Sequence, residues 1–153
     1  MTTSLPEPKP IIPALAPFYD WSRDFSYLIV RLTAGGFLLV HGIVKVMTTT
    51  VAAFAAGSMA RRGLEPALPI AYLIFFLETV GAICIMFGLF TRVFALAIGI
   101  EMLVIAFVAN WAAGFSASKN GWEYPLFWGL IYLAIGLRGG GPYSLDRRLG
   151  KEL

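Results

Sequence analysis

The sequence has little charge. Only 14% of its 153 residues are Asp, Glu, Lys or Arg, whereas 58% are hydrophobic and the mean hydropathy is +0.75. An average soluble domain is about 25% charged, so this composition excludes a soluble globular enzyme. A transmembrane helix needs about 20 residues to cross a hydrocarbon core of about 30 Å, and a chain of this length has room for four. The sequence therefore predicts one small, all-α integral membrane domain.

Cysteine and histidine are nearly absent. The one cysteine, Cys84, lies in an apolar run, so the chain can form neither an internal disulfide nor a Cys-x-x-Cys redox pair. We expect Cys84 to be a packing residue. The one histidine, His41, has no cluster of His and Cys to complete a zinc site, which needs about four ligands. We therefore predict no metal and no haem, and keep His41 as a group that can titrate or hydrogen-bond a quinone carbonyl.

A long, uncharged apolar run is also missing, because the longest stretch without a charged residue covers 102–118. Every crossing must therefore contain or adjoin a charge. We predict an integral membrane four-helix bundle over residues 26–138, with crossings near 26–47, 69–90, 93–115 and 122–138. A short interfacial helix is predicted near 51–61, with Val51, Phe54, Ala55 and Met59 on one face. The very short turn Phe90-Thr91-Arg92 predicts that the second and third crossings form an antiparallel hairpin. Prolines make residues 1–25 a Pro-rich cytoplasmic or interfacial arm, and the glycines that open the cytoplasmic tail, 139–153, end the fourth helix.

The 12 Lys and Arg residues form no basic run, which excludes nucleic acid as the reason for the net charge of +3. They indicate topology instead. Seven lie on one side of the predicted crossings and three on the other: Lys9, Arg23, Arg92, Arg138, Arg147, Arg148 and Lys151 against Arg61, Arg62 and Lys119. By the positive-inside rule, we expect a multi-pass protein of the bacterial inner membrane with both termini in the cytoplasm.

Charged side chains inside the crossings are the candidate site, because each costs about 2.5–3.5 kcal/mol at mid-bilayer unless it faces the bundle interior or water. From their depths along the helices we predict one connected network, with Arg31 matched to Glu101, His41 near Glu78, and Lys45 meeting Glu123 at the outer end. Three interpretations stay open. The pairs either staple four helices together, or form an acid/base cavity that contacts an anion or a quinone, with Arg31, His41, Glu78 and Glu101 as catalytic candidates. Contacts to lipid or a partner are a third.

An ordered set of residues resembles the DoxX family of four-helix bacterial membrane proteins, over residues 27–148. The resemblance rests on Arg31, Gly35-Gly36, His41-Gly42-x-x-Lys45, Glu78-x-x-Gly81, Gly88-Leu89-Phe90-Thr91-Arg92 and Gly141-Pro142-Tyr143-Ser144-Leu145-Asp146. It marks as family motif positions Arg31, His41, Gly42, Lys45, Glu78, Thr91, Arg92, Ser144 and Asp146, without giving them roles.

The resemblance implies a membrane subunit associated with an oxidoreductase at the quinone pool, because the family includes a relative of the membrane subunits of a thiosulfate:quinone oxidoreductase. If catalytic, such a subunit is quinone-linked and not self-sufficient. The alternative is a non-catalytic anchor or assembly subunit, which the lack of a redox centre favours. A small-solute or ion pathway formed by an oligomer is more distant. The expected partners are lipid, other membrane or redox subunits, or a second copy of the chain.

Overall fold

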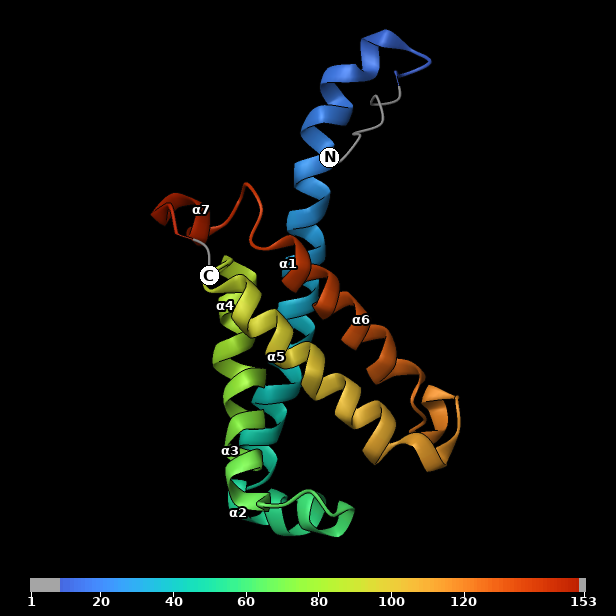
Figure 1. Cartoon of the computed structure of the whole chain (residues 1–153), viewed down its shortest axis with the longest axis vertical. Coiled ribbons are helices and arrows are strands. Elements are labelled where there is room, and N and C mark those ends of the chain that lie inside the picture. Colours follow the sequence, from blue (N-terminus) through green and yellow to red (C-terminus); the bar gives the residue numbers. More distant parts are fainter. Residues whose placement is uncertain (1–8, 152–153) are drawn as a thin grey trace, which may run out of the picture.

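The computed structural model describes residues 9–151, and every regular element among them is helical (Figure 1). The α-helices are α1 (Ala16–Thr48), α2 (Val51–Phe54), α3 (Ala67–Phe76), α4 (Ala82–Phe87), α5 (Thr91–Val104), α6 (Glu123–Arg138) and α7 (Leu145–Leu149). Three π-helical segments continue or join them: Ala55–Met59, Leu77–Gly81 and Ile105–Ala109. Short 3₁₀ turns occupy Pro13–Leu15, Ala60–Arg62, Trp111–Ala113 and Ala117–Lys119. The predicted all-α fold is confirmed.

Three continuous helical stretches are long and apolar enough to cross a membrane: Pro13–Thr48, Ala67–Phe87 and Thr91–Ala109. Their outward faces carry large apolar side chains such as Phe37, Val40, Leu73, Ile100 and Phe107, which is how a helix meets lipid. The fourth predicted segment is α6, with 16 residues. It rises about 24 Å, so it is short against a hydrocarbon core of about 30 Å.

The first and third helices differ in length from the predicted crossings. Helix α1 begins at Ala16, ten residues before the predicted start at 26, because Pro17 stands in its first turn, where a missing N–H costs nothing. The described part of the predicted arm is therefore helical from Pro13 onward, and residues 1–8 lie outside the described residues. The third helix ends at Ala109 instead of 115, where Asn110 leads into a 3₁₀ turn and Gly114 takes a positive φ of 80°.

The helices pack as two pairs. Helix α1 packs on α4 and on the segment Leu77–Gly81, whereas α5 packs along α6 (Figure 1). A tight turn with positive φ at Gly88 and Phe90 joins α4 to α5, which confirms the predicted hairpin. In Figure 1 the two pairs meet near the tail and diverge toward the end that carries α2. The first turns of α1 project beyond the bundle on the opposite side.

The predicted helix near 51–61 is present as α2 and the two turns that follow it. Ala55 and Met59 are buried against Ala71 and Ile74 of α3, and they form a second, smaller core. This is the apolar face that the sequence predicted. The larger core fills the centre of the bundle and includes Leu38, Ile85, Ile98 and Ile135.

Candidate functional site

The site begins with a close approach of two helices. A Cβ atom at Gly42 would overlap the carbonyl group of Glu78, so only glycine lets α1 lie directly against the segment Leu77–Gly81. One turn later on α1, the Lys45 ammonium reaches Glu78 and donates a hydrogen bond to its Oε1. Glu78 is buried, with a side chain only 3% exposed, whereas Lys45 is 26% exposed. The His-Gly-x-x-Lys motif thus builds an ion pair inside the membrane domain.

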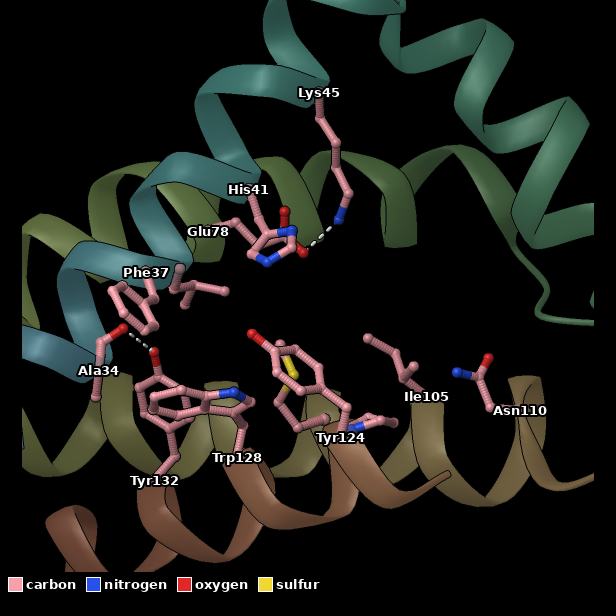
Figure 2. Close-up of a pocket in the computed structure, with 13 residues that line it drawn as sticks. Ala34, Phe37, His41, Lys45, Glu78, Ile105, Asn110, Tyr124, Trp128 and Tyr132 are labelled. Carbon is pink, nitrogen blue, oxygen red and sulfur yellow. Dashed lines mark hydrogen bonds and ion pairs between the residues drawn. The ribbon is translucent and has the colours of Figure 1, made fainter. Parts of the chain in front are cut away.

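A cavity of about 190 Å³ opens beside this ion pair (Figure 2). Helix α1 and Glu78 form one wall, and α6 with the end of the third helix forms the other. The lining is mostly apolar or aromatic: Ala34, Phe37, Leu38, His41, Lys45, Glu78, Met102, Ile105, Asn110, Tyr124, Pro125, Trp128 and Tyr132. A few polar groups in an apolar hollow are typical of a small-molecule site.

Two polar atoms of the lining lack a hydrogen-bond partner among residues 9–151: Oε2 of Glu78 and Nε1 of Trp128. Both carboxylate oxygens of Glu101, which does not line the cavity, lack one as well. Glu101 lies close enough to Glu78 and Lys45 to interact with both electrostatically. Buried polar groups are normally paired, so this concentration of unpaired ones indicates a place for a ligand, a proton or water.

His41 lies on the same wall of the cavity as Glu78 (Figure 2). The predicted nearness of His41 to Glu78 is therefore present, although the hydrogen-bond partner of Glu78 is Lys45 and the His41 side chain is exposed. A flexible lysine one turn further along α1 can reach back to the same carboxylate. His41 remains at the cavity as a titratable group on its rim.

The predicted pairing of Lys45 with Glu123 is wrong. Glu123 accepts a hydrogen bond from the backbone N–H of Ala117 at 3.0 Å and so closes the loop before α6. The close contact at Gly42 brings Lys45 to Glu78 first. Glu123 therefore belongs to a turn and not to the charge network.

Arg31 lies at the other end of the bundle interior, and its predicted partner Glu101 is wrong. Its guanidinium donates to the carbonyl oxygens of Gly140 and Tyr143, although its side chain is only 1% exposed. Gly88 makes room for it, because a Cβ there would overlap the guanidinium. The sequence-based argument from depth missed these acceptors because they come from the tail, which folds back against α1.

The tail is held by other motif residues as well. Asp146 accepts hydrogen bonds from the backbone N–H groups of Phe90 and Thr91, at 2.7 and 2.9 Å, and from Oγ1 of Thr91 at 2.7 Å. It thereby caps the N-terminus of α5. Arg92 donates to carbonyl groups at the end of α6, and Ser144 caps α7. We call this set, Arg31, Thr91, Arg92, Ser144 and Asp146, the tail clamp.

The aromatic wall on α6 was not predicted as part of the site. Tyr124, Trp128 and Tyr132 recur every four residues and so share one face of the helix. That spacing was the available signal. Tyr132 is buried and donates to the carbonyl oxygen of Ala34 at 2.7 Å, which holds α6 to α1 at the closed end of the cavity. As for metals, no group of three or more His, Cys, Asp or Glu side chains lies together within residues 9–151.

Comparison with known proteins decides the family. The model of the DoxX family matches residues 26–111, which is more than half of the chain. The chain belongs to the DoxX family. The match includes Arg31, Gly42, Lys45, Glu78 and Glu101, whereas the α6 wall and the tail of this DoxX chain lie beyond it.

One curated relative is a protein of Haemophilus influenzae described only as an uncharacterized protein. It is 29% identical over 133 residues, which cover 85% of this chain and 95% of the relative. No solved structure matches the chain significantly. The similarity therefore supports the family and leaves the activity to be argued from the site.

Proposed function

We propose that this DoxX chain binds the head group of a quinone in the cavity between α1 and α6, as a membrane subunit that works with an oxidoreductase. The observation that carries the proposal is the set of unpaired polar atoms in an aromatic hollow within the membrane domain. A quinone ring is flat and apolar and has carbonyl oxygens at opposite edges. It needs aromatic walls and hydrogen-bond donors, and the cavity offers both.

The donors lie on facing walls. The indole N–H of Trp128 on α6 has no acceptor among the described residues, and Lys45 on α1 has further N–H groups beside its bond to Glu78. His41 lies on the same wall as Lys45. A carbonyl oxygen at either edge of a ring would therefore find a donor. The volume of about 190 Å³ suits a ring and not a long isoprenoid tail, which would extend into lipid.

Two carboxyl groups and one ammonium meet at this site. Within an apolar interior a net charge is costly, and the Lys45 ammonium offsets the charge of one carboxylate. Reduction of a quinone takes up two electrons and two protons. The electrons would come from a redox subunit, since this chain has no redox centre in its sequence. The carboxyl pair and His41 would pass protons to the ring oxygens.

We further infer that all four long helices cross the inner membrane, with the tail clamp on the cytoplasmic side. The seven-to-three division of basic residues supports this orientation. The short helix α6 fits a crossing if the bilayer thins locally or if Trp122 and Tyr124 mark its outer boundary. The cavity would then open toward the outer half of the membrane.

Quinone binding can be tested on the purified protein in lipid nanodiscs, titrated with a short-chain quinone. Of the four tryptophans, only Trp128 lines the cavity, so we expect saturable quenching of its fluorescence. Trp128→Phe should abolish the saturable component. Trp21→Phe is the matched control, because Trp21 lies on the projecting part of α1, and it should leave that component intact. Quenching that is linear, or equally reduced in both variants, would contradict the proposal.

The second candidate function is a non-catalytic anchor or assembly subunit. The projecting first turns of α1 favour it, because Phe18, Trp21 and Phe25 are exposed there and contact one another, with Trp21 stacked on Phe25. Purification from native membranes distinguishes the two. A co-purified redox enzyme that keeps its quinone activity after Glu78→Gln supports an anchor, whereas loss of that activity with the complex intact supports the quinone site.

A further inference from the structure

We propose that a groove beside α7 binds the phosphate of an anionic phospholipid headgroup. The groove has a volume of about 380 Å³ and lies between the end of α6 and the tail. It is lined by Arg138, Gly141, Ser144, Asp146, Arg147, Gly150 and Lys151. This inference stands independently of the proposed quinone site.

Cations from two segments converge on the groove. Arg138 is the last residue of α6, whereas Arg147 and Lys151 come from α7 and the residues that follow it. Among residues 9–151, Arg147 and Lys151 have no ion-pair partner. Arg138 lies over the ring of Tyr27, with its guanidinium carbon 4.1 Å from the ring centre, which holds it in place without neutralising it.

The one carboxylate in the lining does not neutralise these cations by a direct bond. Both oxygens of Asp146 accept hydrogen bonds from Phe90 and Thr91 at the start of α5. They face that helix end and stabilise it. The groove thus keeps an excess of positive charge that is suited to a phosphate.

The position of the groove indicates that a lipid supplies this phosphate. It lies where α6 ends and, through Asp146, at the level where α5 begins. The ends of membrane-spanning helices lie at the headgroups. Exposed apolar side chains flank the basic groups, with Leu137 76% and Leu149 63% exposed. A soluble anion would leave these apolar side chains exposed, whereas the acyl chains of a phospholipid would cover them.

Native mass spectrometry of the full chain in mild detergent tests the proposal, with phosphatidylglycerol and phosphatidylcholine as probes. We expect at least one phosphatidylglycerol to bind roughly a hundredfold more tightly than phosphatidylcholine. Each Lys or Arg near a membrane surface contributes about fivefold in affinity for anionic lipid. The triple variant Arg138→Gln, Arg147→Gln, Lys151→Gln should therefore bind phosphatidylglycerol roughly a hundredfold more weakly.

Two further variants keep the test decisive. Arg147→Gln with Lys151→Gln retains the Arg138–Tyr27 contact and should still lose affinity roughly 25-fold. The matched control, Arg61→Gln with Arg62→Gln and Lys119→Gln, removes the same charge from the opposite end and should bind phosphatidylglycerol as the unchanged protein does. Equal losses in the two triple variants, or equal affinity for both lipids, would overturn the proposal.

Two outcomes concern other occupants. Inorganic phosphate at millimolar concentration should fail to displace phosphatidylglycerol, and full displacement would overturn the lipid in favour of a soluble phosphate. Glu152→Gln removes the acidic side chain that follows Lys151 in the sequence. An unchanged affinity of this variant for phosphatidylglycerol supports the proposal. Binding of phosphatidylglycerol by this variant but not by the unchanged protein contradicts it.

Discussion

The two ends of the bundle interior carry similar charged side chains and use them differently. At the tail end, the terminal guanidinium N–H groups of Arg31 reach carbonyl oxygens of the tail, so that only its Nε lacks a partner among residues 9–151, and Asp146 accepts three hydrogen bonds. At the cavity end, Lys45 and Glu78 are paired, yet one oxygen of Glu78 and both of Glu101 have no partner among residues 9–151. One set of charges is used by the chain's own backbone. The other is left open toward a hollow.

The motif positions of the family therefore do not form a single site. The motif positions divide between the tail clamp, which fixes where the chain ends fold, and the cavity, which can receive a ligand. A buried charge that is satisfied by backbone contributes to the fold, whereas a buried charge with unpaired atoms is a candidate for chemistry. Stability and ligand binding should therefore separate when the two ends are mutated.

The largest effect is expected from Arg31→Leu. The change removes the hydrogen bonds that the buried guanidinium donates to the carbonyl oxygens of Gly140 and Tyr143, at a cost of about 2–6 kcal/mol for the two together. Adding Glu101→Leu should not rescue it, because the two residues are not partners. Thermal unfolding in detergent measures both, with exposed Arg62→Leu as the control. Rescue by the second change would restore the pairing that the sequence suggested.

A smaller effect is expected from Glu78→Gln. It leaves the Lys45 ammonium without its carboxylate, which costs about 1.5–3 kcal/mol, and the lower figure is favoured because Lys45 is partly exposed. Lys45→Met together with Glu78→Gln should recover much of the loss. Glu101→Gln should be nearly neutral, because neither carboxylate oxygen of Glu101 has a hydrogen-bond partner to lose among residues 9–151. If Glu101→Gln unfolds the protein as readily as Glu78→Gln, Glu101 is part of the structural ion pair.

Asp146→Ala should destabilise by about 1–2 kcal/mol, because it removes the cap of α5. Asp146→Asn keeps an oxygen acceptor and should lose less. The tail of the alanine variant should also become sensitive to trypsin at Arg147 and Arg148, while quinone binding at the far cavity stays unchanged. Weaker quinone binding in Asp146→Ala would show that the two ends are coupled.

Much of the fold could be predicted because its causes are local. Apolar length predicted the helices, Phe90-Thr91-Arg92 predicted the tight turn, and the face of Ala55 and Met59 predicted the short helix that packs on α3. The start of α1 was misplaced because the prolines up to Pro17 were read as an extended arm, although a proline in the first turn is compatible with a helix.

The members of the candidate site could be predicted, but their partners could not. Arg31, Lys45, Glu78 and Glu101 stand out because charges are rare in this chain. Which groups meet depends on two things that periodicity does not contain: the close contact at Gly42, which sets the register of α1 against Glu78, and the return of the tail, which supplies carbonyl oxygens to Arg31. Pairing by depth assumed that charges bond only to charges.

The smallest effect on stability is expected from Trp128→Phe. This variant tests most directly whether the cavity end of the bundle is needed for the fold. The indole N–H has no acceptor among the described residues, so its removal relieves an unsatisfied donor and offsets the loss of ring area. We expect a change of less than about 1 kcal/mol in the free energy of unfolding. At the tail end, every side chain of the tail clamp makes a hydrogen bond that a substitution would remove. No substitution there is therefore expected to cost so little stability. If Trp128 is instead held by a bond that the folded protein needs, Trp128→Phe will lower the unfolding midpoint as Asp146→Ala does, and the cavity end would then be structural too.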